Sequence, residues 1–165
     1  MDLDKANKLA TSIKAVKEEL TFCPCCGNVS LDGGLCEICK DDARDHKTVM
    51  VVESIKDLFT MERTRSFNGV YHVLHGAINL ALGIGVDDIN IASLIARVEE
   101  QKIKEVILAT NATTEGETTA RYIKILLDGK DTTISRIAHG IPFGGDISYA
   151  DELTLLKSIE GRQKY

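Results

Sequence analysis

The sequence contains no long apolar run, no excess of positive charge and no cysteine outside one short segment. No apolar run approaches the roughly 18 residues that would cross a bilayer, and the first twenty residues carry charges throughout, where a signal peptide has an apolar core. We therefore expect a cytoplasmic protein without a membrane segment. The formal net charge of −5 gives no overall attraction to nucleic acid, so any contact with DNA would depend on local basic residues.

The size and composition of the chain favour one main folded domain. Its 165 residues, of which 44% are hydrophobic and 27% charged, are typical of a globular protein. This length leaves room for a small additional module but hardly for a second full core.

All five cysteines lie between Cys23 and Cys39. Four of them form two C-x-x-C pairs separated by nine residues, which is the spacing of a zinc ribbon. Gly27 fits the left-handed turn that such a metal-binding loop needs. The odd count and the missing secretory signal disfavour a disulfide framework. The pattern predicts one structural zinc ion, with Cys25 as a bystander and four ligands: Cys23, Cys26, Cys36 and Cys39.

The remaining sequence alternates between helical and strand-like patterns. Apolar residues recur every three or four positions before the cysteine segment, which predicts an amphipathic helix. After that segment, we expect strands at 48–53, 69–74, 105–110 and 132–138, and helices at 55–64, 91–101, 115–127 and 149–159. This alternation predicts an α/β fold, with a mainly parallel sheet and helices on both of its faces. We divide the chain into an N-terminal helix (1–21), a zinc module (22–46), a central domain (47–130) and a C-terminal segment (131–165).

Two of the predicted strands end in acidic residues. Functional groups gather at the carboxyl ends of the strands in a parallel sheet. Glu53 ends the first of these strands, and the segment Ala109–Glu117, which reads ATNATTEGE, follows the other and opens a helix. The two segments together resemble the Toprim domain of topoisomerases and primases, whose type IA topoisomerase members carry ATDPDREGE. The alternative is that Glu115 and Glu117 only complement the helix dipole.

The Toprim resemblance is incomplete where the chemistry would occur. Asn111 and Thr113 replace two aspartates that, in the family, bind Mg²⁺, an ion held by charged oxygens. Loss of both charges predicts that Mg²⁺ is not a cofactor and that DNA strands are not cleaved. The alternative is a Mg²⁺-dependent nuclease or topoisomerase-like enzyme that uses the surviving glutamates. The degenerate site comprises Glu53, Asn111, Thr113, Glu115, Gly116 and Glu117.

The order of the modules indicates a more specific family. A zinc ribbon directly before a Toprim-like domain, with the segments Phe59–Ile78 and Arg136–Leu155, resembles the RecR family of bacterial recombination mediators over essentially the whole chain. The resemblance implies a non-enzymatic DNA-repair adaptor that works with RecO and RecF to load RecA onto gapped single-stranded DNA. It also implies dimers and ring-like tetramers. Family members begin with a helix-hairpin-helix region that has no counterpart here, so we expect weakened DNA binding and dimers.

The remaining candidates concern partners. Arg44, Arg63 and Arg65 are candidates for contact with DNA phosphates, although each could instead be a surface charge or the partner of a nearby acid. The glutamates of the degenerate site could attract a basic partner such as RecO.

The absence of a G-x-x-x-x-G-K-[ST] motif argues against ATP hydrolysis. A third possibility is a zinc-ribbon scaffold without a DNA role. We assign a subunit contact to one loop, at Gly144, Gly145 and Asp146.

Overall fold

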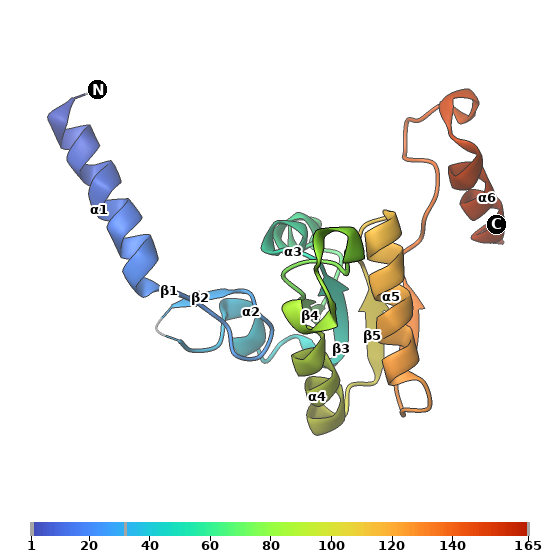
Figure 1. Ribbon diagram of the computed structural model, residues 1–165, viewed down its shortest axis with the longest axis horizontal. Coiled ribbons are helices and arrows are strands. Elements are labelled where there is room, and N and C mark those ends of the chain that lie inside the picture. The colour runs from blue at the N-terminus through green and yellow to red at the C-terminus, as the bar shows by residue number, and fades with distance from the viewer. Residues whose placement is uncertain (1, 32, 165) are drawn as a thin grey trace. The chain divides into compact units, whose positions relative to one another are not determined.

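The computed structural model describes residues 2–31 and 33–164 in two compact units, one ending at Ser135 and the other beginning at Arg136 (Figure 1). The first unit opens with α1 (Leu3–Glu19), which buries none of its residues. A small module follows, formed by the antiparallel strands β1 (Leu20–Phe22) and β2 (Val29–Leu31) and the short helix α2 (Glu37–Lys40). All four paired cysteines belong to this module. The predicted N-terminal helix and the predicted cysteine cluster are therefore both confirmed.

A four-stranded sheet forms the centre of the first unit, in the order β4-β3-β5-β6. The central strand β3 is parallel to both β4 and β5. Parallel neighbours need a long crossover, and the intervening segments supply it as helices. The strands are β3 (Asp45–Val52), β4 (Gly69–Val73), β5 (Glu105–Leu108) and β6 (Thr133–Arg136).

Helices cover both faces of this sheet, as the sequence predicts. Val49 and Val51 of β3 are fully buried in a core that includes Leu94 of α4 and Ile123 of α5. The alternate positions of β3 face the other side of the sheet, where α3 contacts β3 and β4. The helices are α3 (Ile55–Glu62), α4 (Ile91–Gln101) and α5 (Thr114–Leu127). The predicted α/β fold is therefore confirmed.

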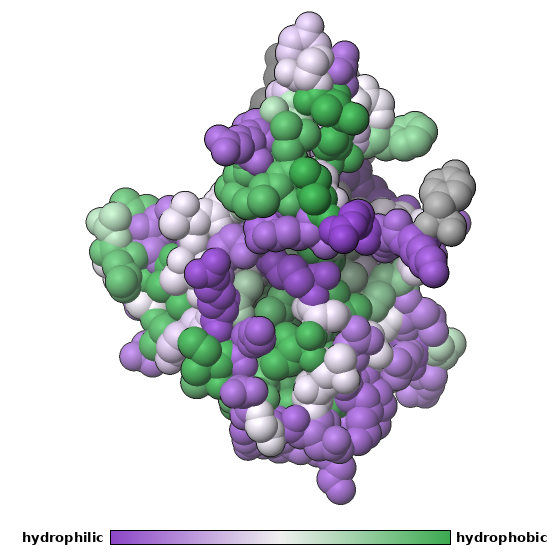
Figure 2. All heavy atoms as spheres, turned by 90° about the vertical axis from the view of Figure 1, so that its right-hand side faces the viewer, coloured by the Kyte–Doolittle hydropathy of each residue, from purple (hydrophilic) through white to green (hydrophobic). Residues whose placement is uncertain are grey.

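The second unit is a loop followed by a short 3-10 helix at Ile147–Tyr149 and by α6 (Glu152–Glu160). None of the residues in α6 is buried. Figure 2 shows hydrophobic side chains exposed among hydrophilic ones. In the part of the chain that the structure describes, no helix is long and apolar enough to cross a membrane.

Candidate functional site

The four paired cysteines converge on one point. Their Sγ atoms all lie within 4.8 Å of one another, and all four side chains are buried. In a tetrahedral zinc site with bonds of about 2.3 Å, sulfurs are about 3.8 Å apart. The 3.5 Å separation between the sulfurs of Cys26 and Cys36 is close to that value. The donor set and its spacing therefore fit a four-thiolate metal site without an open position.

The local backbone explains this convergence. The Gly27 N–H donates to the Cys23 carbonyl at 2.9 Å, which closes a tight turn, and Gly27 itself has a φ of +75°. Cys36 is the residue at the N-cap position of α2 and Cys39 follows three positions later, so their sulfurs lie one helical turn apart. The Asn28 N–H points to the Cys26 sulfur at 3.4 Å. These contacts arrange the thiols before a metal binds.

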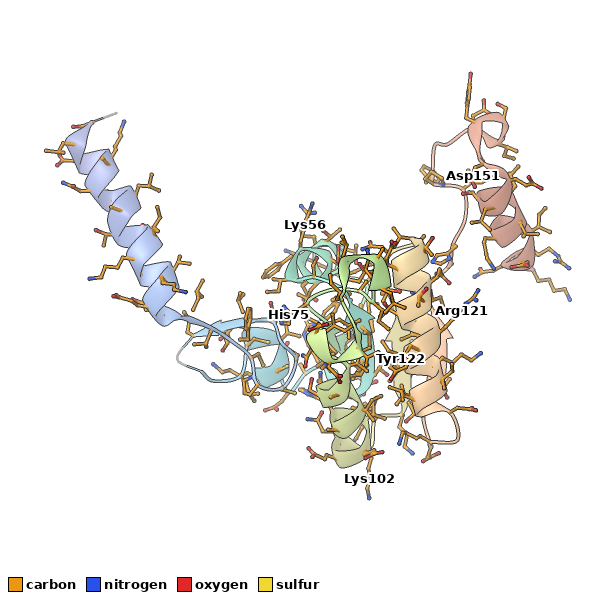
Figure 3. The ribbon with its side chains drawn as sticks, in the orientation of Figure 1. Lys56, His75, Lys102, Arg121, Tyr122 and Asp151 are labelled. Atoms are coloured by element: carbon orange, nitrogen blue, oxygen red, sulfur yellow. The ribbon has the colours of Figure 1, made fainter. Side chains whose placement is uncertain are left out.

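The cysteine module is attached to the end of β4. The Val73 N–H donates to the Cys26 carbonyl at 2.8 Å. A Cβ atom at position 27 would lie 2.9 Å from Nε2 of His75 and 3.0 Å from the Val73 carbonyl, so only glycine fits there. Figure 3 shows His75 beside this module, and its ring lies 4.6 Å from the ring of Phe22. The metal site and the sheet are thus held together by backbone and side-chain contacts.

The cluster perturbs the ionisation of its own thiols. The pKa of Cys36 is lowered, because the thiols of Cys26 and Cys39 donate hydrogen bonds to its sulfur. The pKa of the Cys25 thiol falls to about 5, first through a hydrogen bond from Cys39 and further through the positive charge of Arg97. The pKa values of Cys26 and Cys39 are raised, because their thiols donate these hydrogen bonds. Metal binding needs all four sulfurs as thiolates, so it would release the protons that the cluster holds.

The second candidate site lies at the carboxyl edge of the sheet. Asn111 donates to both oxygens of Glu53, from its backbone N–H at 2.8 Å and from its side-chain amide at 2.6 Å. Glu53 follows β3 and Asn111 follows β5, and these strands are neighbours in the sheet. The structure thus brings together two of the predicted site residues. A neutral amide therefore faces the Glu53 carboxylate.

The start of α5 completes this edge. Thr113 is the N-cap of α5, and its hydroxyl accepts from the Gly116 N–H at 3.1 Å. Gly116 is buried so tightly that a Cβ there would overlap the Asn111 carbonyl oxygen and lie 2.7 Å from Oε1 of Glu53. Thr113 and Gly116 therefore shape the loop that holds Asn111 against Glu53.

Glu115 and Glu117 lie in the first turn of α5. Asn79, from the loop after β4, approaches Oε1 of Glu115 at 3.5 Å. Among residues 2–31 and 33–164, the cysteine cluster is the one group of three or more His, Cys, Asp and Glu side chains with ligand atoms within 4.8 Å. The structure thus does not gather Glu53, Glu115 and Glu117 into such a group.

The three candidate arginines have different surroundings. Arg44 is largely buried and pairs with Glu62 and Asp41, and it also donates to the Gly69 carbonyl at 3.1 Å. Glu62 holds the pKa of Arg44 above its usual value. Arg63 and Arg65 are exposed and line a shallow hollow of about 430 Å³. The structure thus gives Arg44 acidic partners and leaves the other two side chains on the surface.

The predicted subunit-contact loop lies in the second unit. Gly144 adopts a left-handed φ of +82°, and the Gly145 N–H donates to the Pro142 carbonyl at 2.9 Å. Asp146 caps the following 3-10 helix by accepting from the N–H and the hydroxyl of Ser148, which lowers its pKa. These contacts shape the loop, and Phe143 beside them is fully exposed.

Two residues near the cysteine site were missed by sequence analysis. Arg97 is buried in α4, and Gln101, one turn later, approaches the Cys25 sulfur at 3.6 Å. A usable signal was present, because Arg97 follows Leu94 by three positions and precedes Val98 on the apolar side of the helix. A charged residue at such a position needs a buried partner.

Comparisons with known proteins agree with this architecture. A family model described as Toprim domain matches residues 47–138, and one described as RecR, C-terminal, matches residues 140–163. The chain is 49% identical to "Recombination protein RecR" of Enterococcus faecalis over 99% of its own length and 82% of that protein. It is 50% identical to the protein of the same name in Lactiplantibacillus plantarum, with the same coverage, and 48% identical to that of Latilactobacillus sakei.

Proposed function

Because the chain belongs to the RecR family, we propose that it acts in recombinational DNA repair as a non-enzymatic adaptor on DNA. One observation carries the non-enzymatic part of this proposal. Both oxygens of Glu53 accept hydrogen bonds from Asn111, so the carboxylate faces a neutral amide. Phosphoryl transfer by a Toprim enzyme needs a fixed Mg²⁺ ion, and such an ion needs charged oxygen ligands.

Supercoiled DNA tests this proposal directly. The purified chain is incubated with supercoiled and gapped DNA and Mg²⁺, and a Glu53→Ala variant controls for contaminating nucleases. We expect both forms of DNA to stay intact. Nicking or relaxation that disappears in the Glu53→Ala variant would contradict the proposal and favour the alternative of a Mg²⁺-dependent nuclease or topoisomerase-like enzyme.

For the cysteine cluster, we propose one structural zinc ion, held by four thiolates: Cys23, Cys26, Cys36 and Cys39. A closed four-sulfur shell supports folding and offers no position for a reacting water. Metal content after purification tests the assignment. We expect Cys36→Ser to lose zinc, while Cys25→Ser keeps one ion per chain. Equal loss from both variants would show that the ligand set is wrong.

We propose that RecO and RecF are the protein partners, and that the glutamates at the carboxyl edge attract RecO. Glu115 and Glu117 lie in the first turn of α5, where they also complement the helix dipole. Charge reversal at both positions is expected to weaken RecO binding, measured by titration calorimetry with Glu99→Lys as an exposed control. Unchanged RecO affinity would remove this surface from the proposal.

For DNA, we propose that Arg63 and Arg65 contact phosphates, because both are exposed at one hollow. Arg44 is less suited, since its charge is already paired with Glu62. Removal of one phosphate-binding charge should reduce the dependence of log affinity on log salt concentration by about one. We therefore expect Arg63→Ala with Arg65→Ala to flatten this slope, whereas an unchanged slope would exclude both residues.

A further inference from the structure

Arg97 is a buried cation without an acidic partner. Its side chain is only 4% exposed, although it lies on a helix at the surface of the sheet. Its guanidinium donates to the Tyr71 carbonyl at 2.7 Å and to Oε1 of Gln101 at 3.1 Å, and both acceptors are neutral. Within the described part of the chain, no carboxylate forms an ion pair with it. A buried charge left in this way is strongly destabilising.

Hydrogen bonds connect Arg97 to the cysteine cluster. Gln101, one turn further along α4, accepts from Arg97 and donates from Nε2 towards the Cys25 sulfur at 3.6 Å. Cys25 packs directly against the four paired cysteines. Residues four positions apart lie on the same side of a helix. Two successive hydrogen bonds therefore connect the Arg97 guanidinium, through Gln101, to the Cys25 sulfur.

The neighbouring histidine does not compete with Arg97 for this role. His72 is buried beside it, and burial, together with the positive charge of Arg97, keeps the His72 ring neutral at physiological pH. Arg97 is therefore the charged member of this buried pair.

A zinc ion bound by four thiolates carries a formal charge of −2, because four negative sulfurs exceed the charge of the ion by two. We propose that Arg97 is the buried counter-charge of this site, acting through Gln101 and Cys25, and that the bound metal in turn supplies the anion that Arg97 lacks. Arg97 is a positioning residue here, since it does not touch the metal. The inference rests on the zinc proposal above.

This pairing couples metal binding to the stability of the sheet. Metal binding converts all four ligand thiols to thiolates, so it adds negative charge beside the buried positive charge of Arg97. With zinc, the thiolates offset that charge. Removal of the charge should therefore weaken zinc binding and destabilise the zinc-bound protein more than the metal-free protein, whereas a residue that only fills space would destabilise both forms equally.

The experiment uses three variants of the full chain: Arg97→Met, Arg97→Lys and Lys102→Met. Arg97→Met keeps the length of the side chain but not its charge, and Arg97→Lys restores the charge. Lys102, at the end of α4, is exposed and points away from the protein, as Figure 3 shows, although it lines the same hollow as Cys25 and Cys39. It is the matched control for loss of a nearby positive charge.

Zinc affinity is measured by competition with a chelator, and melting temperature is measured with and without zinc. We expect Arg97→Met to weaken zinc binding about tenfold or more, as loss of an outer-shell partner does. We expect Arg97→Lys to recover most of that loss and Lys102→Met to bind zinc like the unmodified chain. Because Arg97→Met also leaves the Tyr71 carbonyl without this donor, we expect its melting temperature to fall less without zinc than with zinc.

Three results would overturn the inference: unchanged zinc affinity in Arg97→Met, equal weakening in Arg97→Lys, or an equal fall in melting temperature with and without zinc. If the unmodified chain binds no zinc, the zinc proposal itself fails, and this inference fails with it. The zinc affinity of the unmodified chain, measured first, therefore distinguishes failure of the zinc proposal from failure of the Arg97 inference.

Discussion

At the scale of single residues, His72 links stability to pH. Its Nε2 lies 2.8 Å from the Asn90 carbonyl, so the neutral ring donates there, and its pKa falls from 6.5 to about 4 because burial disfavours the charged form. The unfolded chain therefore takes up a proton near pH 6.5 that the folded chain resists until about pH 4. Stability should fall as pH decreases through this window, by at most about 1.4 kcal/mol per pH unit.

Urea denaturation between pH 7.5 and 5 measures this effect. We expect His72→Gln to remove that part of the acid-dependent loss, whatever it does to stability at neutral pH. His46→Gln is the control, because His46 lies near the surface. Both variants keep the four paired cysteines, so any release of metal in acid affects them equally. Identical pH slopes in the two variants would show that His72 is not the group responsible.

Asn111 provides a second prediction for a single residue. Asn111→Asp would place a carboxylate oxygen where the amide now donates to Glu53 at 2.6 Å. The loss of this hydrogen bond and the new repulsion should lower the free energy of unfolding by about 1–3 kcal/mol. Because paired carboxylates are the ligands that Mg²⁺ prefers, millimolar MgCl₂ should recover part of this loss.

The comparison for this prediction is Asn111→Ala, which removes the donor without adding a charge. Urea denaturation with and without MgCl₂ should show recovery in Asn111→Asp and none in Asn111→Ala. If Mg²⁺ stabilises neither variant, the neutral amide of Asn111 is not the reason that the carboxyl edge of the sheet fails to bind Mg²⁺.

At the scale of elements, the start of α5 shows how a residue that departs from a catalytic motif can serve the fold. Thr113 stands in the second aspartate position of the Toprim resemblance, and here it caps the helix. Thr113→Ala should cost about 1 kcal/mol, because the Gly116 N–H loses its acceptor. Thr113→Asp should cost little, since aspartate is also a good N-cap. Denaturation with urea checks both values, and equal stability of the alanine variant would contradict the capping role.

Sequence analysis predicted these elements well because their signals are local. The alternation of β-branched runs and amphipathic helices determines the sheet, and the C-x-x-C spacing determines the cysteine cluster. The contact between Glu53 and Asn111 joins residues 58 positions apart and depends on the register of β3 against β5. The partners of Arg97 and Arg44 likewise depend on packing, so a pattern of residue types did not reveal them.

At the scale of the whole molecule, the terminal helices indicate assembly. Both α1 and α6 bury no residue in a single chain, yet both carry apolar side chains. An amphipathic helix is stabilised mainly by packing of its apolar face. We therefore propose that self-association covers the apolar surface of the C-terminal unit, which comprises Phe143, Ile147, Tyr149, Leu153, Leu156 and Ile159.

A charge on this surface should separate the subunits. Leu153 on α6 is 64% exposed, and Ile125 on α5 is 70% exposed, so the two positions are matched in exposure but belong to different units. Burial of a carboxylate in an interface is strongly unfavourable. In sedimentation at micromolar concentration, we expect the unmodified chain and Ile125→Glu to be dimers and Leu153→Glu to shift towards monomer. A dimer that survives Leu153→Glu but not Ile125→Glu would place the contact on α5, and a stable tetramer of the unmodified chain would contradict the expectation of a dimer.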